Sequence, residues 1–375
     1  MKLSKNKQSI KINRRPIIGV FINEKFFQRS KMRRFAQKLV QANEKTRCTL
    51  YFFCLKNINW QEKTICGQLL NKHKQWQKEL FPFPDIIYDR GTGFTGKEKA
   101  MVEAARKRLK KIPDIQFINS CKLDKWQVHQ RLNKYAALKK YLPPTFLSKG
   151  LADIEKKIGR YKYLFLKSAD GSGGKNVFAL EKKTSGFVFS YFSKNKHRKV
   201  TAPTLKNLPQ ALKNLGLKPE GLVLQQGVQL LKLNGCPWDL RVLLVKNNMG
   251  TWETVYTQAR VAPEGAVITN AALGGKVKNY STVYSVLKKG YPSLPTEAQI
   301  SRISLLIARY LEKEFGLFGE IGIDLGIDES GKVWFLEANS KPSKLPEKKL
   351  EGTEGISPQF LKILEYACYL YQKKA

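Results

Sequence analysis

Histidine, paired cysteines and long apolar runs are all scarce in this 375-residue chain. Its three histidines and six cysteines show no C-x-x-C pair and no zinc-type spacing, which excludes the common structural zinc sites. The chain also lacks a Cys-His or Ser-His signature of nucleophilic catalysis. We expect the cysteines to be reduced thiols in the cytosol. They are Cys48, Cys54, Cys66, Cys121, Cys236 and Cys368.

No apolar stretch is long enough to cross a bilayer. The first fifteen residues hold six basic side chains and no acidic one, but the apolar run that follows, Pro16 to Ile22, is too short for the core of a signal peptide. That run is typical of a first β-strand. We therefore expect a cytoplasmic protein, soluble or peripheral, with no signal peptide and no transmembrane segment.

Basic residues far outnumber acidic ones, which gives the chain a strongly positive net charge. The chain has 68 Lys and Arg against 30 Asp and Glu, a formal net charge of +38. The excess is densest in residues 1–120, with 27 basic and 9 acidic side chains. The resulting positive surface potential predicts an anionic partner, which could be nucleic acid, an anionic membrane or an acidic polymer. Nucleic acid is the least favoured, because no zinc finger, RNP-type strand or recognition-helix pattern accompanies the charge.

The composition is otherwise that of a folded protein. Hydrophobic residues make up 42% of the chain and aromatic residues 11%, which is enough for a sizeable core. The length predicts two or three packed units. Strands at 17–22, 49–53 and 85–88, with helical material between them and a helix over 97–111, predict a small open α/β domain over residues 16–120 behind a basic tail, residues 1–15.

A larger α+β unit with antiparallel sheets is predicted from residue 121 onward. It begins with a helix from about Lys122 to Lys140 and continues with strands. We expect the basic, Pro-containing stretch Lys194 to Lys218 to be a mobile connection. The strand candidates are Tyr163 to Lys167, Leu222 to Gln226, Leu240 to Val245 and Thr254 to Val261.

The segment Gly91-Thr92-Gly93-Phe94-Thr95-Gly96-Lys97 satisfies G-x-G-x-x-G and nearly satisfies the P-loop pattern. As a P-loop it fails because Glu98 stands where a Ser or Thr hydroxyl should reach magnesium. As a dinucleotide fingerprint it fails because Asp114 precedes the next strand instead of ending it. We interpret the segment as a Gly-rich turn from a strand to a helix.

A second Gly-rich segment runs from Lys167 to Lys175 as Lys-Ser-Ala-Asp-Gly-Ser-Gly-Gly-Lys and lies between two predicted strands. Its three glycines allow the backbone to present several N–H donors to an anion, which predicts a phosphate cradle. This differs from a P-loop, where the phosphate sits at the start of a helix. Taken alone, the segment also fits an ordinary Gly-rich hairpin.

A predicted β-hairpin in the C-terminal part of the chain brings three oxygen-bearing side chains together. Residues 321, 323, 325 and 327 are apolar and alternate with polar residues or glycine, and the turn Glu329-Ser330-Gly331 leads into a return strand. Residues i and i+2 of a strand face the same way, so Glu337 and Asn339 project together, with Asp324 opposite. Two carboxylates and an amide oxygen on a buried hairpin predict a Mg²⁺ site. An exposed acidic patch fits poorly, because the neighbouring residues are apolar.

Together the second Gly-rich segment and the hairpin resemble the ATP-grasp superfamily, most closely its endospore coat-associated YheC/YheD-like branch. The resemblance covers most of the chain and rests on six blocks in order. The implied fold has two α+β subdomains that grip ATP, residues 121–225 and 226–375, after a small α/β pre-ATP-grasp domain. The blocks are Asn119 to Lys125, Leu166 to Val177, Leu222 to Val228, Trp238 to Leu244, Ala259 to Gly275 and Gly319 to Pro342.

The resemblance implies a role for each matching residue. Lys125 and Lys167 resemble the two phosphate-binding lysines, and a flexible lid covers the phosphates. A hinge segment pairs with the adenine edge. The lid residues are Gly171, Ser172, Gly173 and Gly174, and the hinge residues are Gln225, Gln226, Gly227 and Val228.

The second subdomain supplies the remaining implied site residues. Arg241 and Arg260 resemble the catalytic arginines that, with Lys167, neutralise phosphate charge. Asn270, Gly274 and Gly275 resemble the second loop over the substrate. Asp324, Glu337 and Asn339 match the ligands of Mg²⁺, with Mn²⁺ as an alternative metal. The chain departs from the family at Ser168, where Pro is frequent, and at Ala338, where Val is common, and no ribose partner is identified.

The implied activity is ATP-dependent joining of a carboxylate to an amine through an acyl phosphate, with release of ADP. The implied substrate is a carboxylate-bearing small molecule, peptide or anionic polymer of the spore coat or cell envelope, and spore-coat proteins are expected partners. The alternative is a non-catalytic basic structural or binding protein of the spore coat with a vestigial nucleotide site.

Overall fold

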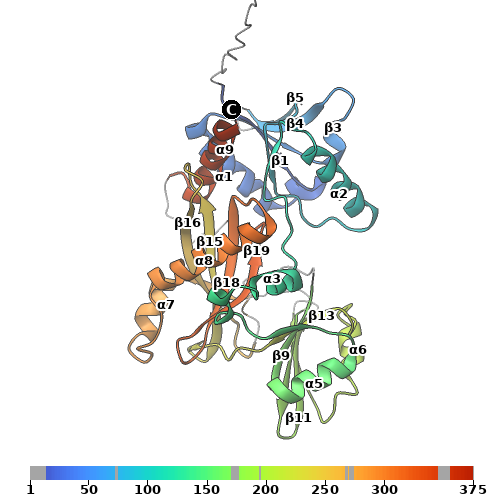
Figure 1. The fold of residues 1–375 in the computed structure, drawn as a ribbon, viewed down its shortest axis with the longest axis vertical. Helices are drawn as coiled ribbons and strands as arrows, with labels where there is room; N and C mark the ends of the chain where they lie inside the picture. Colours follow the sequence, from blue (N-terminus) through green and yellow to red (C-terminus); the bar gives the residue numbers. More distant parts are fainter. Residues whose placement is uncertain are drawn as a thin grey trace, which may run out of the picture.

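A computed structural model describes residues 14–71, 75–169, 177–193, 196–266, 269, 274–344 and 355–374. These residues form three β-sheets that follow one another along the chain (Figure 1). In Figure 1 the first sheet lies at the top, the third in the middle and the second at the bottom. The Gly-rich residues 171–174 and Asn270 lie outside the described residues.

The first sheet has the strand order β3-β4-β2-β1-β6-β7, with β5 paired to β4. Its centre is parallel: β1 pairs with β2 and β6, and β6 pairs with β7. The apolar strand β1 is almost wholly buried, as parallel central strands usually are. The strands are β1 (Ile17–Phe21), β2 (Thr49–Phe53), β3 (Ile58–Asn59), β4 (Thr64–Leu70), β5 (Trp76–Pro82), β6 (Ile86–Asp89) and β7 (Gln116–Ile118).

Two helices of this unit, α1 (Ser30–Thr46) and α2 (Gly96–Lys110), pack into separate apolar clusters against the sheet. Short 3-10 helices η1 (Glu24–Gln28) and η2 (Leu55–Asn57) accompany them. The first Gly-rich segment connects β6 to α2, so its interpretation as a strand-to-helix turn is confirmed. Gly93 and Gly96 have positive φ values of 79° and 52°, which explains the glycines there.

The expectation of helical material between 53 and 85 is wrong, because β4 and β5 form an antiparallel hairpin there. The strand pattern is hidden at Gly67, which has no side chain. A Cβ at Gly67 would lie 2.6 Å from the ring of Tyr51, which stacks on Phe81 at 4.4 Å. The aromatic rings occupy the space beside Gly67, so this strand position carries no apolar side chain that could be recognised in the sequence.

The second sheet is antiparallel, with strand order β12-β11-β10-β9-β13-β8. Helices α5 (Leu151–Tyr161) and α6 (Leu208–Lys213) bury their apolar side chains in its core. The strands are β8 (Thr145–Leu147), β9 (Tyr163–Ser168), β10 (Val177–Lys183), β11 (Gly186–Ser193), β12 (Lys196–Ala202) and β13 (Leu222–Gln226).

The stretch Lys194 to Lys218 is not a mobile connection, because it contains β12 and α6. Strand β12 pairs with β11 along its length and forms the edge of the sheet. Arg198, Lys199 and Val200 are exposed there, so the apolar alternation expected of a half-buried strand is missing.

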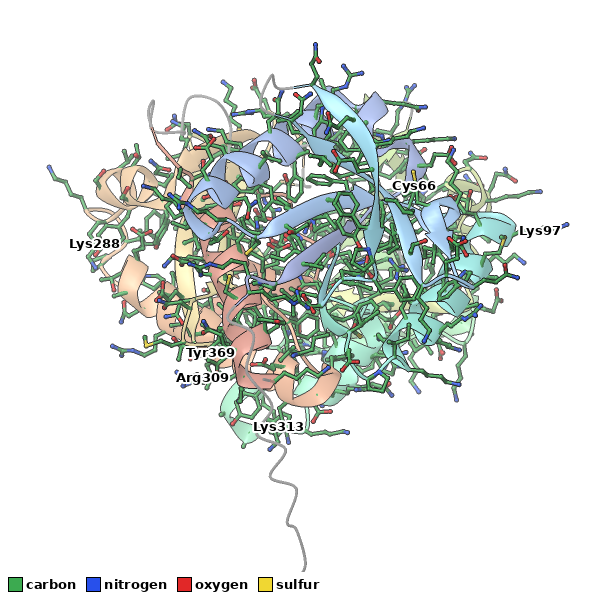
Figure 2. All side chains as sticks on the ribbon, turned by 90° about the horizontal axis from the view of Figure 1, so that it is seen from above. Cys66, Lys97, Lys288, Arg309, Lys313 and Tyr369 are labelled. Carbon is green, nitrogen blue, oxygen red and sulfur yellow. The ribbon has the colours of Figure 1, made fainter. Side chains whose placement is uncertain are left out.

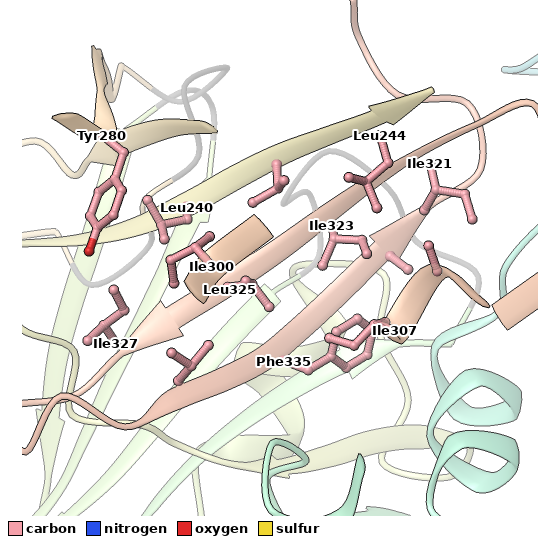
Figure 3. Close-up of a cluster of buried hydrophobic side chains, with 14 of the residues drawn as sticks. Leu240, Leu244, Tyr280, Ile300, Ile307, Ile321, Ile323, Leu325, Ile327 and Phe335 are labelled. Carbon is pink, nitrogen blue, oxygen red and sulfur yellow. The ribbon is translucent and has the colours of Figure 1, made fainter. Parts of the chain in front are cut away.

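The third sheet has the order β17-β16-β15-β18-β19, with β14 (Lys232–Leu233) paired to β15. Its strands are β15 (Cys236–Lys246), β16 (Trp252–Val261), β17 (Lys276–Asn279), β18 (Glu320–Ile327) and β19 (Val333–Asn339). Helix α7 (Tyr280–Leu287) and the long helix α8 (Glu297–Phe315) pack against one face, where Ile300 and Ile307 meet the apolar side chains of the strands (Figure 3).

The linking segment before the second sheet forms two short helices, α3 (Lys125–Leu132) and α4 (Ala136–Lys139), instead of one long helix. Tyr135, in an extended conformation, separates them, and its hydroxyl donates a hydrogen bond to Glu314.

The C-terminal helix α9 (Pro358–Lys374) returns to the first unit and packs against α1 and β15 (Figure 1). Leu243 and Val245 of β15 share one apolar cluster with α1 and α9. The sulfur atoms of Cys48 and Cys368 lie 3.4 Å apart here as free thiols. None of the described helices combines the length and apolar character needed to span a membrane.

Candidate active site

The hairpin of β18 and β19 forms as predicted. Asp324 pairs with Glu337, and Asn339 pairs with Gly322. Directly opposed residues of an antiparallel pair project to the same face, so the three oxygen-bearing side chains share one face. The alternate side chains Ile323 and Leu325 lie in the core on the other face (Figure 3). Burial of the apolar face therefore fixes the direction of the three oxygen-bearing side chains.

Asp324 lies in a buried cluster of two arginines and two carboxylates. On neighbouring β15, Arg241 donates two hydrogen bonds to Asp324, at 2.5 and 3.0 Å. Arg260 on β16 donates two hydrogen bonds of 2.6 Å to Asp239, and its Nη2 lies 3.1 Å from Oδ2 of Asp324. Thr269 also donates to Asp239. The arginines thus lie beside the predicted metal ligand, in bidentate geometry that orients them firmly.

The ionisation of Asp324 follows from these contacts. Burial works to raise its pKa, but the charges and hydrogen bonds of Arg241 and Arg260 outweigh that effect and hold the pKa below its usual range. Asp324 is therefore an anion at neutral pH, the form required of a metal ligand.

A pocket opens between the second and third sheets. Two lysines line it, Lys125 at the start of α3 and Lys167 on β9, together with Glu337. Lys125 Nζ is 3.7 Å from Glu337 Oε1, and Lys167 Nζ donates a 2.6 Å hydrogen bond to Gln225 Oε1. The remaining wall is mostly apolar. It consists of Leu123, Val128, Pro143, Val223, Phe335, Leu336 and Ala338, together with the polar residues His129 and Thr145.

Burial controls the charge of Lys167. Desolvation lowers its pKa to about 8, while the negative charges of Glu337, Asp324 and Asp239 oppose that decrease. The ammonium group is thus poorly solvated and close to carboxylates of the hairpin. An anionic ligand would supply the solvation that it lacks.

Two of the predicted hinge residues, Gln226 and Gly227, make backbone hydrogen bonds to other parts of the protein. Gln226 N–H donates to Pro144 O and Gly227 N–H donates to Tyr163 O, both at 2.8 Å. These two donors are therefore committed within the protein. Of the second loop, Gly274 and Gly275 precede β17, and Gly274 has a φ of 93°. The structure thus brings Lys125, Lys167, Gln225 and Glu337 together, with Arg241, Arg260 and Asp324 in the adjoining cluster.

His129 and Thr145 line the pocket but were missed in the sequence. A signal for His129 existed, since it follows Lys125 by four residues and so lies on the same face of α3. Burial lowers its pKa to about 4, so it is neutral at physiological pH. Thr145 carried no such signal, because it is placed by the antiparallel pairing of β8 with β13.

The donor set of the hairpin suits Mg²⁺. Within the part of the chain that the structure describes, no three His, Cys, Asp or Glu side chains lie close enough to hold a metal ion by themselves. Asp324, Glu337 and Asn339 offer two carboxylates and one amide oxygen, all hard donors. Magnesium typically completes such partial sets with water and phosphate oxygens. The residues therefore fit a metal that binds together with a phosphate ligand.

Comparisons with known proteins place most of the chain beside one family. A family model described as YheC/D-like ATP-grasp matches residues 114–370, more than half of the chain. The endospore coat-associated protein YheD of Bacillus subtilis (strain 168) is 29% identical over 96% of this chain and 79% of its own length. The endospore coat-associated protein YheC of the same strain is 26% identical over 72% of this chain and 73% of its length.

Among solved structures, D-alanyl-alanine synthetase A from Vibrio cholerae O1 biovar eltor str. N16961 has a similar fold. Its TM-score is 0.55, with 16% sequence identity, and the match covers 95% of this chain and 99% of that one. At this identity the likeness shows the fold alone, and it includes the first sheet as well as the two that follow.

Proposed function

The chain belongs to the YheC/D-like ATP-grasp family, and from this premise we propose that it is an ATP-dependent, ADP-forming ligase that activates a carboxylate as an acyl phosphate and joins it to an amine. The observation that carries the proposal is the convergence of Lys125, Lys167 and Glu337 in one pocket whose other lining residues are mostly apolar. Such a site suits a nucleotide, with the base against the apolar residues and the phosphates beside the two lysines.

In the first step an oxygen of the substrate carboxylate attacks the γ-phosphorus, and the bond to ADP breaks. Both reactants are anionic, so catalysis consists mainly of charge compensation and positioning. Lys125 and Lys167 offset phosphate charge, and Arg241 and Arg260 hold the carboxylate and the phosphoryl oxygens. Mg²⁺, held by Asp324, Glu337 and Asn339, would neutralise phosphate oxygens when bound. The lid 171–174 excludes water that would hydrolyse the product.

In the second step an amine attacks the acyl carbon and inorganic phosphate leaves. No enzyme nucleophile is required, which agrees with the sequence. We propose that the carboxylate belongs to a small molecule, peptide or anionic polymer of the spore coat or envelope, because the relatives are named as coat-associated proteins. The enzyme then acts in the cytoplasm at the forming coat, with spore-coat proteins as partners.

The test is incubation with Mg-ATP and a panel of amino acids, acidic peptides and cell extract, with ADP release followed over time and products identified by mass. The proposal predicts ADP and phosphate together with a condensed product. ADP formation no faster than in a blank with every mixture, combined with no binding of Mg-ATP, would contradict it.

A second candidate is a basic binding protein of the spore surface with a vestigial nucleotide site. Its supporting observation is the uneven charge: residues 1–221 hold 49 of the 68 basic side chains but 15 of the 30 acidic ones. On α2, Lys97 extends into solvent (Figure 2). This alternative predicts binding of an anionic polymer that weakens steeply with salt and is unaffected by ATP. Affinity that stays constant from low to high salt would exclude it.

A further inference from the structure

A buried polar cluster joins the first sheet to both strands of the β18–β19 hairpin at its open end. We call it the hairpin clamp, and its members are Tyr88 and Arg90 at the end of β6, Asn119 after β7, Glu320 at the start of β18 and Lys344 beyond β19. All five lie outside the ATP pocket and its arginine cluster. The side chains of Glu320 and Lys344 have no exposed surface, and that of Arg90 is 10% exposed.

Glu320 is the centre of the clamp. Its carboxylate accepts hydrogen bonds from the Tyr88 hydroxyl at 2.6 Å and from Arg90 Nη1 at 2.5 Å. Its other oxygen lies 3.0 Å from Lys344 Nζ. Arg90 Nη2 also donates a 2.8 Å hydrogen bond to the carbonyl of Pro342. Arg90 and Lys344 therefore tie the first residue of β18 to the segment that follows β19.

Asn119 connects the same two chain segments through their backbones. Its side-chain NH₂ donates to the carbonyl oxygens of Glu320, at 3.0 Å, and of Ser340. Its side-chain oxygen accepts from the N–H groups of Gly319, at 2.8 Å, and Glu320, at 3.3 Å. Asn119 itself has a φ of +61°, a left-handed conformation that asparagine adopts more readily than most other residues, and these contacts fix it.

The clamp lies next to the proposed metal ligands along the chain. Glu320 is four residues before Asp324 on the same strand, and Ser340 directly follows Asn339. Because Gly322 pairs with Asn339, the clamped ends of the two strands are also adjacent across the sheet. A shift of either end would therefore change the separation between Asp324 on one strand and Asn339 on the other.

Stability alone does not explain this choice of residues. Burying a carboxylate and two cations carries a large desolvation cost, and apolar residues of similar volume often stabilise a core as well or better. Ionic clusters instead fix direction and distance, because each hydrogen bond is lost when its partner moves. A clamp of this type suits a place where two strands must be held in a defined relation.

We propose that Arg90 and Lys344 are positioning residues of the ligase, which hold the two strands of the hairpin so that Asp324, Glu337 and Asn339 act on one metal ion. The inference rests on the proposed function. It means that the first sheet, through Arg90, helps to position the metal ligands. Neither residue touches the nucleotide pocket, so both act through the hairpin.

The test measures binding of Mn²⁺ as the metal probe, by electron paramagnetic resonance in the presence of ATP, to the full chain and its variants. Removal of a group that hydrogen-bonds a metal ligand directly typically weakens metal binding roughly 10- to 100-fold. Arg90 acts one contact further away, through Glu320 and Pro342, so its effect belongs at the lower end of that range. We expect Arg90→Gln to weaken Mn²⁺ binding about tenfold and Arg90→Lys to restore part of it. Binding of ATP without metal should stay unchanged, because the pocket is not altered.

The matched control is Lys246→Met. Lys246 is also a buried cation, paired with Glu312 on α8, but its side chain does not contact the clamp. We expect it to lower the melting temperature and leave Mn²⁺ affinity unchanged. Should Arg90→Gln fail to fold, Tyr88→Phe removes only one hydroxyl from Glu320, and a smaller loss of affinity is expected from it.

The outcomes distinguish a failure of the clamp hypothesis from a failure of the proposed ligase function. Wild-type binding of Mn²⁺ with ATP, together with unchanged affinity in a folded Arg90→Gln or Tyr88→Phe variant, would show that the clamp serves packing only. Failure of the wild-type chain to bind Mn²⁺ with ATP would overturn the proposed function itself, and this inference with it.

Discussion

In the ligase proposal, the buried charge of Lys167 serves binding at the expense of stability. Its burial and lowered pKa mean that the surrounding protein solvates its ammonium group poorly. We predict that Lys167→Met lowers kcat on the order of a hundredfold, since a preorganised charge opposite the phosphates is lost. The melting temperature should change little, because removal of a buried ammonium group relieves a desolvation cost that offsets the lost hydrogen bond to Gln225. Steady-state kinetics and thermal unfolding measure the two effects.

The control for this change is Lys182→Met, on an exposed position of β10 in the same sheet. It should leave both kcat and the melting temperature nearly unchanged. Equal losses of rate in the two variants would show that Lys167 has no special role in the pocket.

His129 gives the site a predictable response to acid. Its pKa in the folded protein is about 4, below the ordinary value of 6.5, because burial disfavours the charged ring. A depressed folded pKa contributes stability that is complete above pH 6.5 and is lost as pH falls toward 4. We predict that His129→Gln makes the melting temperature decline less steeply between pH 6.5 and 4. Parallel declines in the two proteins would contradict this assignment.

Single residues of the site were predictable to different degrees. Strict alternation in β18 placed Asp324, and the i, i+2 spacing placed Glu337 and Asn339 on the same face. The pairing of Asp324 with Arg241 was not predictable, because it depends on the register of β15 against β18. The roles of all these site residues stay predictions, and residues 171–174 and Asn270 also lie outside the described part of the chain.

At the scale of secondary structure elements, close packing at Gly227 sets the junction between β13 and β9. A Cβ at Gly227 would lie 2.1 Å from Cδ1 of Tyr163, a distance that atoms cannot keep. We predict that Gly227→Ala lowers the free energy of unfolding by about 1–3 kcal/mol through overpacking. Denaturant unfolding gives the value.

Gly159 in α5 is the matched control, because a Cβ there would meet nothing within 4 Å. Gly159→Ala should raise the free energy of unfolding by about 0.5–1 kcal/mol, the usual gain from alanine in a helix. If the two substitutions had the same sign, the close approach of Gly227 to Tyr163 would be wrong.

Elements with strong periodicity were predicted, and edge elements were not. The buried strands β1, β2 and β18 carry continuous or alternating apolar residues that identify them. The hairpin of β4 and β5 and the edge strand β12 expose one side, and their register depends on neighbours distant in sequence. The break between α3 and α4 at Tyr135 likewise depends on a partner, Glu314, far along the chain.

At the scale of the whole molecule, the three sheets are joined by contacts that no local pattern contains. The hairpin clamp connects residues more than two hundred positions apart, such as Tyr88 and Glu320. Helix α9 closes the chain back onto α1. The order of the units was predictable from the family resemblance, but the division of the chain at residues 120 and 225 stays a proposal.

The charge asymmetry is also a property of the whole chain. Residues 222–375 hold 19 basic and 15 acidic side chains, so the part that carries the β18–β19 hairpin is nearly neutral. The excess positive charge lies on the units that precede it. In the ligase proposal the electrostatic field of this excess charge attracts an anionic substrate. The contribution of that attraction to the association rate should decrease as the salt concentration increases.

The most direct test of the central claim is isothermal titration calorimetry of ATP into the wild-type chain and Glu337→Gln, each with Mg²⁺ and with EDTA. Exposed Glu155→Gln on α5 is the matched control. We predict that Mg²⁺ lowers the Kd of ATP for the wild type and for Glu155→Gln but has little effect on Glu337→Gln. Equal Kd values for all three proteins, with or without the metal, would contradict a magnesium-dependent nucleotide site at the hairpin.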